Sequence, residues 1–180
     1  TDPSSDFFGR SWSNSSYGWG TNPTVASVEF SPDLTVADGT NGLDSRVMRM
    51  TPLDGTVGAT SAQYSPYFWG GSLDPLSADT FFYTGQTEPT FWRVNLNTLT
   101  LENADPDNHL GANLPRAVLV VSEAGVRYAY FAIGYTIQKA PMTATQLSGP
   151  PVTVADFSAD LRYSRQLRTD TEGNLYWVTR

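Results

Sequence analysis

The sequence contains no cysteine, a single histidine and a single lysine. The absence of cysteine excludes thiolate catalysis, cysteine-ligated zinc and iron–sulfur clusters. It also weighs against a small secreted eukaryotic domain, which normally carries disulfides. A chain of 180 residues buries roughly 70% of the surface that its unfolded form exposes, so its core needs neither a disulfide nor a metal.

Long apolar runs are also absent. The longest, Ala117 to Val121, has the length of a strand, whereas a membrane-spanning helix needs roughly 20 apolar residues. The net charge of −7 and the pI near 4.5 repel phosphate backbones and anionic lipids. We therefore expect neither nucleic-acid binding nor membrane insertion.

The basic residues are ten arginines and Lys139. A surface poor in lysine is typical of protein interfaces, because arginine makes planar, hydrogen-bonded contacts. A GC-rich genome would produce the same bias, so the composition leaves both explanations open.

Helical periodicity is missing throughout the chain. Twelve prolines and fifteen glycines keep any helix short, and the best helical turn, near Leu73–Ala78, is limited by Pro75. Short runs rich in valine, threonine and aromatic residues recur instead. They are Val25–Phe30, Arg46–Met50, Thr80–Thr84, Phe91–Leu96, Ala117–Ser122, Arg127–Ile133, Val152–Phe157, Leu161–Leu167 and Leu175–Thr179.

Two connections between these runs predict β-hairpins. Ser122–Gly125 and Thr169–Asn174 each place a glycine between two apolar runs, and we expect Gly125 to adopt a positive φ. About nine short antiparallel strands with frequent turns and long loops predict an all-β fold, a β-sandwich or jelly roll. The long loops are expected at Thr51–Tyr67 and Asn103–Pro115.

Residues 1–22 differ in composition from the rest. They are rich in serine, asparagine and glycine, with aromatic residues among them (Phe7, Phe8, Trp12, Tyr17 and Trp19). We expect residues 1–22 to form an arm that packs onto another surface, and residues 23–180 to form a single β-sandwich domain. The sequence opens with neither a methionine nor a signal peptide, which predicts a fragment of a larger protein.

Catalytic signals are weak. His109, in an acidic loop, would have to serve any Ser-His-Asp site, and no nucleophile elbow is present. A glycosidase needs two carboxylates roughly 5–10 Å apart across a cleft, and only Glu29 lies on a predicted strand where it could line a groove. We therefore expect no enzyme activity.

The sequence supports a calcium site better than a catalytic site. Glu102, Asp105, Asp107 and Asn108 bring hard oxygen atoms together in one loop, as calcium prefers. A second acidic segment runs from Asp38 to Asp44. The same residue types also form ordinary turns, so the sequence leaves both interpretations open.

Aromatic residues give the strongest signal, because the chain has nine Phe, nine Tyr and five Trp. Adjacent residues on a strand point to opposite faces. Pairs such as Phe91–Trp92 and Tyr176–Trp177 therefore require either a sheet covered on both faces or aromatic rings at the surface.

One aromatic segment, Tyr64–Gly71, carries the proline and glycines of a loop. Aromatic rings on a loop can bind a glycan or a protein, and alternatively they close the end of a core. We take Tyr64, Tyr67, Phe68 and Trp69 as candidate receptor- or ligand-binding residues.

The opening Asp6-Phe7-Phe8-Gly9-Arg10 followed by Gly18-Trp19-Gly20 is similar to the opening of some actinophage minor tail domains. Across its whole length the chain resembles in type the projecting or receptor-binding domains of non-enveloped viruses and phage tails, which are cysteine-poor, aromatic-rich β-sandwiches or jelly rolls. The resemblance implies a homo-oligomer, a dimer or trimer, that binds a host receptor protein or glycan at the virion surface. The alternatives are a carbohydrate-binding module of an extracellular bacterial protein and a small glycosidase or esterase.

Overall fold

The computed structural model describes residues 25–30, 37–41, 46–51, 56–60, 68–85, 90–160, 164–170 and 172–179. The predicted arm, residues 1–22, lies outside these ranges. In the described part of the chain, the fold consists of antiparallel strands and one 3-10 turn, Ser158–Asp160. The predicted all-β, antiparallel class is confirmed. No helix in these ranges is long and apolar enough to cross a membrane.

The strands form three four-stranded sheets and one two-stranded sheet, each made of strands that follow one another in sequence. The first sheet contains β1 (Val25–Phe30), β2 (Ala37–Asn41), β3 (Arg46–Thr51) and β4 (Thr56–Thr60). The second contains β5 (Phe68–Asp74), β6 (Ser77–Gly85), β7 (Phe91–Asn95) and β8 (Thr100–Asn103). The third contains β9 (Ala117–Glu123), β10 (Val126–Ile133), β11 (Thr136–Met142) and β12 (Val152–Asp156), and the fourth pairs β13 (Ser164–Thr169) with β14 (Leu175–Thr179).

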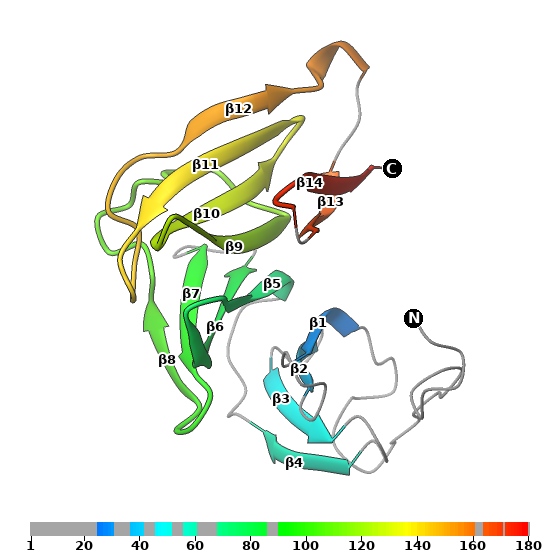
Figure 1. Ribbon diagram of the computed structural model, residues 1–180, viewed down its shortest axis with the longest axis vertical. Coiled ribbons are helices and arrows are strands. Elements are labelled where there is room, and N and C mark those ends of the chain that lie inside the picture. Colours follow the sequence, from blue (N-terminus) through cyan, green and yellow to red (C-terminus); the bar gives the residue numbers. More distant parts are fainter. Residues whose placement is uncertain are drawn as a thin grey trace.

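The sheets are arranged like a fan around a common centre. Strands β1, β5 and β9 lie toward this centre, whereas β4, β8 and β12 lie at the periphery (Figure 1). The first strands of successive sheets are in contact, β1 with β5, β5 with β9 and β9 with β13. We call β1, β5, β9 and β13 the innermost strands.

This arrangement does not confirm a sandwich or jelly roll. A jelly roll needs strands that return by long connections to pair beside earlier ones. Every strand pairing in the described ranges instead joins neighbours in sequence. The described part of the chain is therefore an all-β fold in which each sheet is an antiparallel meander.

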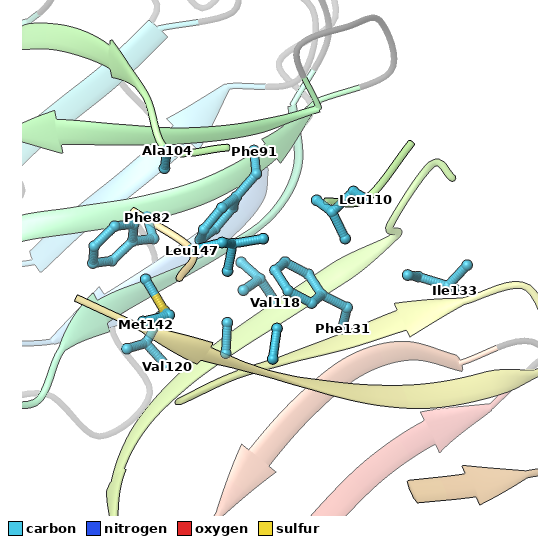
Figure 2. Close-up of a cluster of buried hydrophobic side chains, with 12 residues drawn as sticks. Phe82, Phe91, Ala104, Leu110, Val118, Val120, Phe131, Ile133, Met142 and Leu147 are labelled. Atoms are coloured by element: carbon cyan, nitrogen blue, oxygen red, sulfur yellow. The ribbon is translucent and has the colours of Figure 1, made fainter. Parts of the chain in front are cut away.

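The β5–β8 sheet is covered on both faces. In β6, Phe82 packs with Val118 and Phe131 of the β9–β12 sheet, while Phe81 and Tyr83 belong to a separate cluster with Val94. Figure 2 shows the first cluster, in which Phe82 and Phe91 stack with ring centroids 5.5 Å apart. Phe91 belongs to the first cluster and Trp92 packs against the second. The sheet is therefore covered on both faces, which is one of the two arrangements expected for the Phe91–Trp92 pair.

A third cluster joins the β9–β12 sheet to β13 and β14. Leu119, Ile137 and Leu167 are buried in it, and the Phe157 and Trp177 rings pack with centroids 4.9 Å apart. Each contact between sheets thus depends on alternating residues that send side chains to opposite faces.

Two glycines allow β5 to lie close to its neighbours. A Cβ atom at Gly70 would lie 2.7 Å from the Ala117 Cα of β9, and one at Gly71 would overlap the Phe81 ring of β6. Residues 68–71 belong to β5, so the expectation that they form part of a loop is wrong. The glycines mark close packing of backbone and not a turn.

The two predicted hairpins are confirmed, with φ of 50° at Ala124, 81° at Gly125 and 84° at Gly173. The helical turn predicted near Leu73–Ala78 is wrong, because β5 and β6 join there in a tight hairpin. The Leu76 N–H donates to Asp74 Oδ1 at 2.9 Å and stabilises that turn. Five strands were not expected from the sequence: β2, β4, β5, β8 and β11.

Candidate ligand-binding cleft

Three hairpin turns meet around one cleft. The strands β5, β9 and β13 each lead into a hairpin, and the ends of these strands bring the three turns together. The resulting cleft has a volume of about 320 Å³ and is lined on its apolar side by Pro75, Val120, Val121 and Leu175. This volume lies at the small end of the range for small-molecule sites.

The polar side of the cleft carries two carboxylates and three hydroxyl groups, those of Glu123, Asp170, Ser122, Tyr130 and Thr169. The cleft has no arginine, lysine or histidine among its lining residues. The charged groups of the lining itself are therefore all negative.

A buried ion pair holds the first two turns together. The Arg127 Nε of β10 donates to both carboxylate oxygens of Asp74, each at 3.0 Å, and the Asp74 side chain has no exposed surface. This pair joins the end of β5 to the start of β10 and fixes two of the three turns relative to each other.

Glu123 lies in a preformed network. The Tyr130 hydroxyl donates to Glu123 Oε1 at 2.8 Å, and the Lys139 ammonium donates to Oε2 at 2.5 Å. The Lys139 nitrogen also lies 4.0 Å from the Tyr128 ring centroid and 5.4 Å from that of Tyr130. The hydrogen bond from Lys139 is the main reason why the pKa of Glu123 is lowered, and it outweighs a partial desolvation.

Asp170 organises the third turn. Its Oδ1 accepts the backbone N–H groups of Glu172 and Asn174, and its Oδ2 accepts the Asn174 amide and the Tyr176 hydroxyl, all at 2.8 to 2.9 Å. The hydrogen bonds from Asn174 lower the pKa of Asp170 to about 2. Because a carboxylate offers about four acceptor positions, those of Asp170 are all in use.

Both carboxylates of the cleft are ionised hydrogen-bond acceptors at neutral pH. A general acid at neutral pH needs a raised pKa, yet the pKa values of Glu123 and Asp170 are both lowered. Glu123 keeps about two acceptor positions for a ligand, since only two of them are used by Tyr130 and Lys139.

The residues predicted to bind a receptor are not brought together in the described part of the chain. Tyr64 and Tyr67 lie outside it, and Phe68 begins β5. The Trp69 ring is partly buried and lies under the Arg116 guanidinium, whose Cζ is 4.9 Å from the ring centroid. Trp69 stands at the opposite end of β5 from the cleft, and its binding role stays a prediction.

Two of the four predicted calcium ligands, Glu102 and Asp105, already have close protein partners. Glu102 pairs with Arg93 at 2.6 Å, and the buried Asp105 accepts the backbone N–H groups of His109 and Leu110 at 2.8 and 2.9 Å. Asp107 lies 3.9 Å from the His109 ring. Asn108 has a φ of 53°, the conformation of a turn.

Within the described ranges, no three His, Asp or Glu side chains are arranged to hold a metal ion. The second acidic segment falls partly in β2, which ends at Asn41. Calcium binding therefore stays a prediction. The predicted glycosidase residue, Glu29, lies in β1, outside the part of the structure in which side chains are described.

Sequence reasoning missed the cleft. It assigned Glu123 to an ordinary hairpin turn and did not link this residue to the lone lysine. A signal was present, because Tyr130 pairs directly with Lys139 across β10 and β11. The closeness of the Glu123 carboxylate to this pair can be predicted only when the registers of β9 with β10 and of β10 with β11 are known.

Comparisons with known proteins give similarity of structure alone. No family model matches the chain, and no curated protein matches it in sequence. Hydrazine synthase of Kuenenia stuttgartiensis superposes on 93% of this chain and 45% of its own, with a TM-score of 0.66 and 12% identity. A nidogen/laminin complex superposes on 87% of this chain and 57% of its own, with a TM-score of 0.66 and 16% identity.

A third similar structure is the Cps50 (Swd1) β-propeller domain of Myceliophteria thermophila, with a TM-score of 0.59 and 10% identity. The superposition covers 88% of this chain and 51% of that domain. The chain thus spans about half the length of these three structures. At such identities the likeness concerns the fold alone.

Proposed function

We propose that this chain is a non-catalytic binding domain built on a β-propeller scaffold. In a propeller, four-stranded antiparallel sheets form blades around a central axis. The three four-stranded meanders with innermost strands in mutual contact, and the β13–β14 pair beside β9, support this interpretation. The sandwich and jelly-roll alternatives lack such support, because no described strand returns to pair with an earlier sheet.

One observation carries the proposed function, namely the cleft at the ends of the innermost strands. It combines an apolar wall with Glu123, whose orientation is fixed by Tyr130 and Lys139 before any ligand arrives. A preorganised polar group in an apolar concavity is the usual basis of a small-molecule site. The lowered pKa of Glu123 keeps its side chain an acceptor at neutral pH.

The proposal is tested by mapping the binding of small molecules with backbone amide NMR spectra of the full chain. We expect neutral, cationic and anionic fragments to differ in binding, and those that bind to shift the amides of Val121, Ser122, Gly173 and Leu175. Amides near Trp69, at the opposite end of β5, serve as the internal reference. If fragments of all classes leave the cleft amides unshifted, the proposed function is wrong.

A second candidate function, self-association of a surface attachment domain, is supported by the outer strand β12. Val152 is 61% exposed and Val154 is 48% exposed, and no described strand pairs with the outer edge of β12. An exposed apolar edge strand can pair with another chain. This feature agrees with the dimer or trimer expected of a receptor-binding domain at a virion surface.

Light scattering on a sizing column tests self-association. We expect a dimer or trimer, and we expect Val152→Lys and Val154→Lys to shift it toward monomer. The control is Leu114→Lys, at an exposed apolar residue that lies in the loop between β8 and β9. A monomer at all concentrations would remove this candidate, and a change of mass in EDTA would instead implicate a bound metal.

A further inference from the structure

We infer that the cleft recognises an uncharged ligand with neighbouring hydroxyl groups, the chemistry of a saccharide, and that Glu123 is its principal hydrogen-bond acceptor. The inference rests on the proposed binding function and specifies its ligand class. Four observations carry it: the position of Lys139, the charge of the lining, the free hydrogen-bonding capacity of the polar side chains, and the apolar wall.

Lys139 already fills the position that a cationic ligand would take. Its ammonium group donates to Glu123 Oε2 at 2.5 Å and lies over the Tyr128 ring at 4.0 Å. A ligand ammonium or guanidinium group would need both the carboxylate and an aromatic face. It would therefore have to displace an internal cation that is held by both.

Anionic ligands meet the opposite difficulty. Glu123 and Asp170 line the cleft, the Lys139 ammonium beside them is already bound to Glu123 at 2.5 Å, and the chain carries a net charge of −7. A phosphate or carboxylate would be repelled and would find no cationic partner among the lining residues. Uncharged ligands are the class that remains.

The unused hydrogen-bonding groups match those of adjacent hydroxyls. Glu123 has about two acceptor positions left, whereas the Tyr130 hydroxyl is already engaged by Glu123 and Lys139. The Ser122 hydroxyl can both donate and accept. Two neighbouring ligand hydroxyls can thus donate to the two free positions of Glu123 while one of them accepts from Ser122.

The apolar wall suits the C–H face of a sugar ring. Pro75 is exposed, and Val121 and Leu175 are partly buried, so a ring placed against them removes apolar surface from water. Asp170 contributes shape to this site rather than a bond, because its four acceptor positions serve the hairpin.

The experiment measures the affinity of the full chain for methyl glycosides of glucose, mannose and galactose, with methylguanidinium and methyl phosphate as charged probes, by NMR titration in calcium-free buffer. We expect at least one glycoside to bind and to shift the cleft amides. Because hydrogen bonds to charged groups contribute roughly 1.5–3 kcal/mol, Glu123→Gln should weaken that binding by about tenfold or more. Tyr130→Phe and Ser122→Ala should weaken it by about threefold to tenfold each.

Glu102→Gln is the matched control, because Glu102 also pairs with a cation, Arg93 at 2.6 Å, but does not line the cleft. It should leave the glycoside affinity unchanged. Ser122→Ala removes a single hydroxyl group, so it tests the site even if Glu123→Gln lowers the folded population. Thermal melting of each variant measures that population.

The outcomes separate the inference from the proposed function. Binding of methylguanidinium or methyl phosphate at the cleft, without any glycoside, would overturn the inference and retain the binding function. Glycoside binding that neither Glu123→Gln nor Ser122→Ala weakens would also overturn it, since the ligand would then bind elsewhere. If no probe of any class shifts the cleft amides, both the inference and the proposed function fail.

Discussion

The Arg127 Nε atom lies 3.0 Å from each carboxylate oxygen of Asp74, and this buried ion pair links the β5–β8 sheet to the β9–β12 sheet. Removal of one partner from such a pair leaves a charge in a poorly solvated site. Arg127→Ala should therefore lower the free energy of unfolding by about 3 kcal/mol. Chemical denaturation measures the change.

The reference for that substitution is Glu102→Gln, which breaks a pair whose carboxylate side is 53% exposed. Exposed pairs contribute up to about 1 kcal/mol, so the loss should be much smaller. Equal losses of unfolding free energy in the two variants would show that the Asp74–Arg127 pair contributes no more than an exposed ion pair.

Gly70→Ala tests the close approach of β5 and β9. The new methyl group would lie 2.7 Å from Ala117 Cα, and backbone cannot rotate away as a side chain can. We expect a loss of roughly 1–3 kcal/mol, as in other overpacked cores. Gly134→Asn is the comparison, because Gly134 has a φ of 56° and open space around it, and asparagine tolerates that conformation. A tolerated Gly70→Ala would mean that the innermost strands can separate.

The pKa of Asp170 predicts a pH dependence for the β13–β14 hairpin. The folded pKa of about 2 lies below the ordinary value of 3.8, so the ionised carboxylate stabilises the folded hairpin above pH 4. That contribution is lost as the pH falls through about 2. The difference in melting temperature between the natural chain and Asp170→Ala should shrink over this interval.

Tyr176→Phe provides a more specific measurement of the same network. It removes the hydroxyl that donates to Asp170 Oδ2 at 2.9 Å, so the pKa of Asp170, followed by NMR titration of its carboxyl carbon, should rise. An unchanged pKa would show that Tyr176 does not hold the carboxylate in solution.

Trp69 and Arg116 should be coupled in stability. The guanidinium lies 4.9 Å from the ring centroid, and a cation–π contact of this kind contributes about 0.5–1 kcal/mol. A double-mutant cycle of Trp69→Leu and Arg116→Ala should yield a coupling energy of that size. Trp69→Leu should leave ligand affinity at the cleft unchanged, and weakened binding would instead favour a receptor site at this end of β5.

Local sequence signals predicted the hairpins well because a turn is specified by a few adjacent residues. Gly125 and Gly173 supply positive φ values where the chain reverses, and the apolar runs on either side pair directly. The runs beginning at Val25 and Leu175 have the bounds that the sequence predicted. Such features need no knowledge of distant contacts.

The arrangement of the sheets could not be read in the same way. Gly70 and Gly71 have the composition of a loop, and only the position of Ala117 and of the Phe81 ring shows why they occur in a strand. The adjacent pair Phe91–Trp92 required either buried faces on both sides of a sheet or exposed rings, and the neighbouring sheets decide between these. The cleft was missed for the same reason, since Glu123 and Asp170 meet only through the packing of three hairpins.

The consecutive order of strands within each sheet has a kinetic consequence. Every strand pairing described joins elements that are neighbours in sequence, so the backbone hydrogen bonds within each sheet close short loops. Local pairing of this kind favours rapid formation of each meander, and contact between successive sheets favours stepwise growth from any one of them. We therefore expect hydrogen-exchange protection to vary by meander rather than uniformly, with the β5–β8 and β9–β12 meanders, joined through the cluster around Phe91, exchanging most slowly.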